Sequence, residues 1–296
     1  MKIFDCFMFF DEEMILDLRL NCLYNDVDYF VIVESNFNHN GEKRNLLFNK
    51  NKFKKFMDKI IYLIYDEVPK EIETINSKDT ETEKDRKFIM NALYRENGQR
   101  NFISKGLGKA LDEDLILISD VDEIPKLDFK TLKKINNKII LFKQDMFYYK
   151  FNLTIPNFKW TGTKCVKKKD LISPQWLRNI KDRKYPFYRL DTFFSKTKYT
   201  NVKIINDGGW HFSNMKSAKL IEHKLKSYLH HREFDQESLN VRQIEELIKK
   251  KKAIYDLSVD KRVNKVGNGK ILEKYDLKKL PFYISNNLKK YKEWID

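Results

Sequence analysis

Apolar runs and polar stretches alternate along the first 125 residues in a way that predicts strands and helices in turn. Runs rich in Phe, Val and Ile predict four strands, at 3–10, 28–34, 59–64 and 114–119. Helices are predicted between them, at 12–24, 53–57 and 87–107, with a polar loop at 66–85. This β-α-β-α-β-α-β order predicts an α/β sheet with short right-handed crossovers.

The second predicted strand is apolar at consecutive rather than alternating positions, as Val31, Ile32 and Val33 show. An uninterrupted apolar run favours a parallel strand that is covered on both faces of the sheet. Sheets of this kind bind ligands beyond the carboxyl ends of their strands. The residues directly after the strands are therefore the first places to look for function.

The remaining residues, 126–296, follow a less regular pattern. They predict a helix at 126–136, strands at 138–143 and 146–153, mixed short strands and loops over 158–214, and helices at 216–231, 236–252 and 284–294. No internal repeat and no Gly/Ser-rich linker separates the two parts of the chain. We therefore expect a single domain over 1–296, built from a half at 1–125 and a half at 126–296.

Charge is distributed unequally between these halves. The chain has 58 Lys and Arg against 43 Asp and Glu, a net charge of +15. Residues 1–125 hold 18 basic and 25 acidic groups, a net of −7, so residues 126–296 carry +22. Such a basic surface suggests an anionic partner. A bias toward Lys and Asn is also what an AT-rich genome would write on any surface, so both interpretations stay open.

The cysteines and the N-terminus bear on location. Cys6, Cys22 and Cys165 are far apart and form no CxxC pattern, which argues against a zinc module and fits a reducing cytosol. We expect no signal peptide from the opening residues, and no stretch approaches the ~18 apolar residues that a membrane span requires. We expect a cytoplasmic protein. Peripheral contact of the basic half with the inner membrane face stays open as a further possibility.

The most informative segment directly follows the fourth strand, where Asp120, Asp122 and Glu123 precede Pro125. Clustered carboxylates repel one another, and a divalent cation removes that repulsion. Asp120 and Asp122 lie on one side of an extended chain and are expected to hold one Mg²⁺ or Mn²⁺ ion. The alternative is a solvated acidic turn that caps the next helix.

Three further segments carry candidate chemistry. In the segment 207–213, two glycines permit close backbone approach, and His211 is able to complete a carboxylate metal site. Segment 34–36 offers polar groups at the same carboxyl edge, and segment 95–101 pairs residues at i, i+4 spacing. The alternatives are a tight turn before an aromatic strand, a hydrogen-bonded turn and a surface ion pair, respectively.

These segments, in this order, resemble glycosyltransferase family 17. The matching stretches are 5–10, 19–24, 27–36, 99–101, 120–125 and 209–213. The resemblance implies a type A glycosyltransferase fold, a Rossmann-like mixed sheet flanked by helices with a less regular C-terminal half on the acceptor side. It also implies an inverting, metal-dependent transfer of N-acetylglucosamine from UDP-N-acetylglucosamine to a glycan hydroxyl through a β1,4 bond.

The same resemblance implies roles for particular residues. Asp120 and Asp122 would hold Mn²⁺ or Mg²⁺ with His211 as a further ligand. The donor would be contacted by Glu34, Ser35, Asn36, Gln99, Arg100, Asp120 and Trp210. The catalytic candidates are Glu123, Asp122 and Asp207. An inverting transfer needs a carboxylate base, for which Glu123 is preferred over Asp207 and Asp145.

Two other classes of protein remain as alternatives. A two-metal nucleic-acid-processing enzyme would use the carboxylates and the basic half, although the Lys runs have no interleaved aromatic residues. A non-catalytic carbohydrate- or membrane-surface-binding module would use the aromatic residues. The expected partners are a nucleotide-sugar donor and a glycan, glycoprotein or lipid-linked glycan acceptor, and not nucleic acid.

Overall fold

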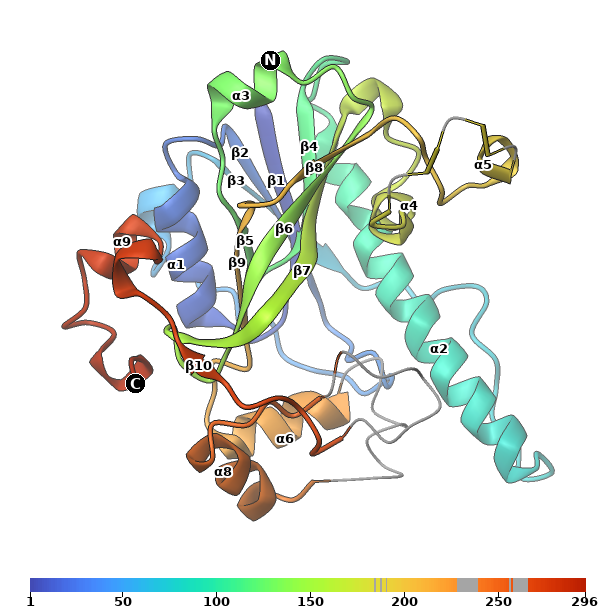
Figure 1. Cartoon of the computed structure of the whole chain (residues 1–296). Helices are drawn as coiled ribbons and strands as arrows, with labels where there is room; N and C mark the ends of the chain where they lie inside the picture. The colour runs from blue at the N-terminus through green and yellow to red at the C-terminus, as the bar shows by residue number, and fades with distance from the viewer. Residues whose placement is uncertain (184, 187, 190, 228–238, 256, 258–265) are drawn as a thin grey trace.

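The computed structural model describes residues 1–183, 185–186, 188–189, 191–227, 239–255, 257 and 266–296. One large mixed sheet forms the centre of the molecule, and helices cover both of its faces (Figure 1). The strand order is β3-β2-β1-β4-β7-β6-β9-β5, with β10 beside β7 and β8 beside β6. This arrangement confirms the predicted α/β class and the Rossmann-like mixed sheet.

Four parallel strands make up the first half of the sheet, as the sequence predicted. They are β1 (Ile3–Phe9), β2 (Tyr29–Ser35), β3 (Ile60–Tyr65) and β4 (Leu115–Asp120). The helical elements between them are α1 (Glu13–Leu23), η1 (Lys54–Phe56), α2 (Glu81–Phe102) and η2 (Ile103–Leu107). The parallel order brings the carboxyl ends of β1, β2 and β4 to one edge.

Both faces of β2 are buried, which confirms the prediction from its continuous apolar run. Phe30 and Ile32 pack into the core that includes α1, and Val31 and Val33 pack into the core that includes Ile103. Successive side chains of a strand point to opposite faces, so one strand serves both cores. Burial of side chains of this size contributes about 1.5–3 kcal/mol each.

Helix α2 begins earlier than expected. Its N-cap is Thr80, whose hydroxyl accepts a hydrogen bond from the Glu83 amide at 3.3 Å, while the Glu83 carboxylate accepts from the Thr80 amide at 2.8 Å. This reciprocal capping box satisfies two backbone donors that a helix otherwise leaves unpaired. The predicted start at residue 87 was therefore wrong, because the polar first turns were taken for loop.

The second half of the chain completes the sheet. Its strands are β5 (Glu123–Pro125), β6 (Ile139–Tyr148), β7 (Leu153–Lys167), β8 (Val202–Ile205), β9 (Gly209–Ser213) and β10 (Glu273–Lys274). The prediction of separate strands at 138–143 and 146–153 was wrong, because β6 continues through two register shifts opposite β7. The acidic segment after β4 continues directly into β5, which pairs antiparallel with β9.

The helices of this half are short. They are α3 (Phe129–Lys134), η3 (Lys168–Asp170), α4 (Pro174–Asn179), α5 (Asp191–Phe194), α6 (Ala218–Ser227), α8 (Val241–Lys249), η4 (Leu277–Lys279), α9 (Phe282–Ser285) and η5 (Lys292–Trp294). The predicted helix at 126–136 is shorter because Asp128 caps it. The one predicted at 284–294 was wrong, because two separate short turns form there.

Parts of two other predicted helices, 228–231 and 236–238, lie outside the described residues. Within the described ranges, no helix combines the length and the apolarity that crossing a bilayer requires.

Close packing of η2 on the sheet gives the first prediction. A Cβ atom at Gly106 would lie 2.4 Å from Val31 Cγ1 and 3.3 Å from Leu63 Cδ1. Gly106→Ala should therefore overpack this face and lower the free energy of unfolding by about 1–3 kcal/mol in urea titrations. Gly108→Ala is the matched control, because a Cβ there meets no atom within 4 Å. Equal stabilities of the two variants would contradict the packing argument.

Candidate active site at the carboxyl edge of the sheet

A buried ion pair fixes the backbone of the acidic segment. The Arg19 side chain is 0% exposed, and its Nε and Nη2 donate to the two Asp5 carboxylate oxygens at 2.7 and 2.6 Å. Its Nη1 donates to the carbonyl oxygens of Asp120, Val121 and Glu123 at 3.1, 3.2 and 2.8 Å. One guanidinium thus links α1 and β1 to the acidic segment and holds the backbone of that segment in place.

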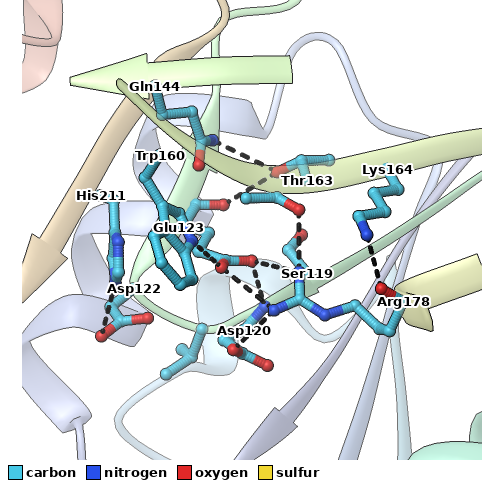
Figure 2. Close-up of polar contacts among 12 residues, drawn as sticks. Ser119, Asp120, Asp122, Glu123, Gln144, Trp160, Thr163, Lys164, Arg178 and His211 are labelled. Carbon is cyan, nitrogen blue, oxygen red and sulfur yellow. Dashed lines mark hydrogen bonds and ion pairs between the residues drawn. The ribbon is translucent and has the colours of Figure 1, made fainter. Parts of the chain in front are cut away.

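A second arginine, Arg178 of α4, bridges two of these acidic side chains (Figure 2). Its Nη2 donates to Asp120 at 2.9 Å, and its Nη1 donates to Glu123 at 2.8 Å. The indole nitrogen of Trp160 donates to the same Glu123 carboxylate at 2.7 Å. Burial alone would raise the pKa of Asp120, but Arg178 and then Arg100 outweigh burial and hold that pKa well below its usual range.

The end of α4 that carries Arg178 is held by a buried lysine. Lys164 Nζ donates to the carbonyl oxygen of Ile180 at 2.6 Å and to that of Arg178. A cation at the C-terminal carbonyls of a helix is favoured by its dipole. Burial, reinforced by the Arg178 charge, lowers the pKa of Lys164 to about 7.

A cavity of about 240 Å³ opens at the carboxyl ends of β1, β2 and β4. Three phenylalanines, Phe9, Phe10 and Phe37, line it together with polar side chains that include Ser35 and Gln99. The Gln99 side chain is held in place because its Nε2 donates to the Val33 carbonyl oxygen at 3.1 Å. The cavity thus combines flat apolar surface with fixed hydrogen-bonding groups.

The wall of this cavity also carries charged groups that come from both halves of the chain. His211 of β9 approaches Asp122, with Nε2 and Oδ2 3.5 Å apart, and Lys224 Nζ lies 3.9 Å from the same oxygen. Burial lowers the pKa of His211, but the Asp122 carboxylate outweighs burial and raises it. Antiparallel pairing of β9 with β5 brings His211 opposite Glu123 and so delivers it to the acidic turn.

Asp122 and His211 offer one oxygen and one nitrogen donor to a divalent cation. The His211 Nδ1 is buried without a hydrogen-bond partner, and the other ring nitrogen, Nε2, is the one that faces Asp122. The described ranges contain no group of three His, Cys, Asp or Glu side chains able to hold a metal ion. Mg²⁺ commonly takes one or two protein carboxylates and completes its shell with phosphate oxygens and water, and Asp122 supplies one such carboxylate.

The sequence comparison decides the family. The model of glycosyltransferase family 17 matches residues 1–295, nearly the whole chain. The chain belongs to glycosyltransferase family 17. Membership confirms the family resemblance seen in the sequence, and the mixed sheet with its flanking helices agrees with a type A glycosyltransferase fold. It also favours a transferase over the nucleic-acid enzyme and the binding module.

Other comparisons of this family 17 glycosyltransferase add little. No curated protein matches the chain. A solved structure that does match is HddC from Yersinia pseudotuberculosis complexed with GMP-PN. It is 9% identical, the match covers 70% of this chain and 91% of that chain, and the TM-score is 0.30. A likeness this weak supports no argument about function.

The structure gathers five of the residues proposed from the sequence around the 240 Å³ cavity. They are Ser35, Gln99, Asp120, Asp122 and His211. They come from β2, α2, β4 and the turn after it, and β9, so segments far apart in sequence meet at one edge.

Other proposed residues lie behind the cavity wall. The buried Glu34 carboxylate accepts from the Tyr62 hydroxyl at 2.7 Å and the Leu47 amide at 2.6 Å. The side-chain oxygen of Asn36 is buried without a hydrogen-bond partner. Arg100 donates to Asp120 at 3.2 Å, so it acts on the cavity through that carboxylate.

Glu123 also lies behind the wall, held by Arg178 and Trp160. The remaining candidates, Asp207, Trp210 and Asp145, do not line the 240 Å³ cavity. Asp207 is 74% exposed and pairs with Lys126. Trp210 Nε1 donates to the Lys279 carbonyl oxygen at 3.0 Å. Asp145 pairs with Lys159 and accepts from the Tyr275 hydroxyl, beside a different cavity.

Sequence reasoning missed several charged residues of the site, above all Arg178, Lys164, Lys224 and Glu12. A signal for Arg178 was present in the composition. The chain has 47 Lys but only 11 Arg, and a planar, bidentate guanidinium is not replaceable by an ammonium group. In a Lys-rich chain, each Arg is therefore a candidate for binding carboxylates through two hydrogen bonds.

The buried ion pair gives a stability prediction. Arg19→Met leaves the Asp5 carboxylate buried without its partner, which should lower the free energy of unfolding by about 3–5 kcal/mol in urea titrations. Arg86→Met is the matched control, because Arg86 pairs with Glu73 with similar bidentate geometry but at the surface. That variant should change stability little. A loss below about 1 kcal/mol in Arg19→Met would contradict the proposed importance of the pair.

Lys164 gives a prediction about pH. Its pKa of about 7 in the folded protein lies below the ordinary value of 10.5, so between these pH values the unfolded chain binds more protons. The stability of the wild type relative to Lys164→Met should therefore rise from pH 7 to pH 9, by less than about 1.4 kcal/mol per pH unit. Parallel pH profiles of the two free energies of unfolding would contradict this.

Proposed function

We propose that this glycosyltransferase moves N-acetylglucosamine from UDP-N-acetylglucosamine to a hydroxyl group of a glycan, with inversion and formation of a β1,4 bond. Family membership supports the reaction class. The observation that carries the proposal further is the 240 Å³ cavity, where Asp120 and Asp122 meet the carboxyl ends of β1 and β2. Nucleotides bind at this edge in α/β sheets.

The cavity suits a nucleotide diphosphate. The rings of Phe10 and Phe37 offer apolar surface to the uracil, and Ser35 and Gln99 offer hydrogen bonds to polar atoms of the nucleoside. Arg44 lines the same cavity and is anchored through the Ser35 carbonyl oxygen at 3.2 Å. Its guanidinium stacks on Phe10, with 4.2 Å between the guanidinium carbon and the ring centroid, and pairs with the buried Glu34 carboxylate at 3.3 Å.

Phosphate charge would be met by the charged side chains that line the same cavity. Asp122 and His211 would hold Mn²⁺ or Mg²⁺ against the diphosphate. The bound ion would supply Lewis-acid stabilisation for the leaving UDP. Lys224, which is close to Asp122, adds a cation of the chain itself to the same wall. Asp120 stays ionised because Arg178 and Arg100 face it, so it contributes a fixed negative charge beside the cation.

The acceptor is proposed to be a glycan, a glycoprotein or a lipid-linked glycan. The net charge of +22 in residues 126–296 supports an acceptor or a surface that is anionic, since opposite charge accelerates encounter. We also propose a cytoplasmic location, with the basic half available for peripheral contact at the inner membrane face.

Asp122→Asn tests the donor site. It removes the carboxylate charge that faces His211 and Lys224 while keeping the side-chain shape. UDP release from UDP-N-acetylglucosamine with MnCl₂ should fall by about 100-fold or more, as expected when a transition-state charge contact is lost. Excess chelator should give a similar loss in the wild type.

Asp170→Asn is the control for this experiment. Asp170 pairs with Lys138 at the opposite edge of the sheet, so its loss should leave the rate unchanged. Full activity in Asp122→Asn, or full activity in excess chelator, would remove the basis for the proposed cation site.

A further inference from the structure

A second, larger cavity of about 540 Å³ adjoins the first. Three side chains, Glu12, Asp122 and Lys224, line both cavities and so form their boundary. A group-transfer site needs two binding spaces that meet at the reacting atom. The shared boundary is where a sugar held in the first cavity and an acceptor held in the second would come together.

The lining of the second cavity suits a sugar chain. Tyr149, Met215 and Trp294 offer apolar surface, and Lys150, Asn214 and Ser217 offer hydrogen-bonding groups. Carbohydrates present C–H faces and hydroxyl edges, so they are bound by apolar surface with a few placed polar groups. The cavity also exceeds the first in volume, as an oligosaccharide acceptor would require.

Glu12 is the boundary carboxylate best placed to receive a proton. It lies just before α1, its side chain is 5% exposed, and its Oε1 lies 3.4 Å from Lys216 Nζ and 3.9 Å from Lys224 Nζ. The two ammonium groups favour the ionised carboxylate that a base requires. The other boundary carboxylate, Asp122, faces His211 and is used in the proposed donor site.

Two other carboxylates considered from the sequence, Glu123 and Asp207, do not meet this requirement. Glu123 is 0% exposed, and its oxygens accept from Arg178, Trp160 and the Asp120 amide. Asp207 lines neither of the two cavities. Neither side chain has a path to a hydroxyl group at the boundary.

We propose that the second cavity binds the acceptor glycan and that Glu12 is the general base of the transfer; this rests on the proposed function. The acceptor oxygen forms a bond to the anomeric carbon of the donor sugar. The bond from that carbon to the β-phosphate oxygen breaks, and its electron pair leaves with UDP. The acceptor proton passes to the Glu12 carboxylate, so atoms and charge balance without another reactant.

Glu12→Gln tests the base, because it keeps the shape and removes the ability to accept the proton. Transfer from UDP-N-acetylglucosamine is measured with a panel of p-nitrophenyl glycosides of N-acetylglucosamine, mannose and galactose. We expect a fall in kcat of about 100-fold or more and loss of the acidic limb of the pH profile. The dissociation constant for UDP-N-acetylglucosamine, from calorimetry, should stay unchanged.

The matched control is Glu113→Gln. Glu113 also contacts two lysines, Lys167 and Lys169, but at the opposite edge of the sheet. This variant should keep the wild-type kcat. A kcat in Glu12→Gln within threefold of the wild type would overturn the assignment of the base. Loss of donor binding in Glu12→Gln would overturn it too, since Glu12 would then belong to the donor site.

Trp294→Leu tests the acceptor cavity, because leucine keeps the apolar packing and removes the ring. The KM for the p-nitrophenyl glycoside should rise severalfold while the KM for the donor stays constant. An unchanged KM for the glycoside would overturn the acceptor assignment. A wild-type protein that does not bind UDP-N-acetylglucosamine would instead overturn the proposed function, so the two failures are distinguishable.

Discussion

The buried pair of Arg19 and Asp5 is the constraint on which the site depends. Three negatively charged side chains within four residues would repel one another and leave a turn of uncertain shape. Arg19 prevents this, because its guanidinium binds the backbone carbonyl oxygens of that turn while the Asp5 carboxylate compensates the guanidinium charge. The backbone is thereby fixed before any ligand arrives, and the side chains are free to face different neighbours.

Those neighbours separate the acidic residues into different roles. Asp120 and Glu123 turn toward Arg178, which keeps them behind or at the edge of the cavity, whereas Asp122 turns toward His211 and Lys224. The unequal charge of the two halves is reflected in the contacts of this site. Cations of the basic half approach carboxylates of the acidic half at this edge, so the site exists only where the halves meet.

Much of the fold was predictable because each signal was local. The apolar runs of β1 to β4 identified the parallel strands, and their order placed Ser35 and Asp120 at one edge. The start of α2 was missed because a capping box of polar residues resembles a loop. The partners of the acidic turn were missed because Arg178 and Lys224 reach it only through the tertiary fold.

Hydrogen exchange measured by mass spectrometry, with and without UDP-N-acetylglucosamine and Mn²⁺, tests the central claim most directly. If the donor binds at the edge fixed by Arg19, segments 8–12, 35–39 and 119–123 should gain protection together. The separate cavity that Trp160 and Arg178 line should not gain protection. Protection confined to segment 158–182, with no change at 119–123, would contradict the account.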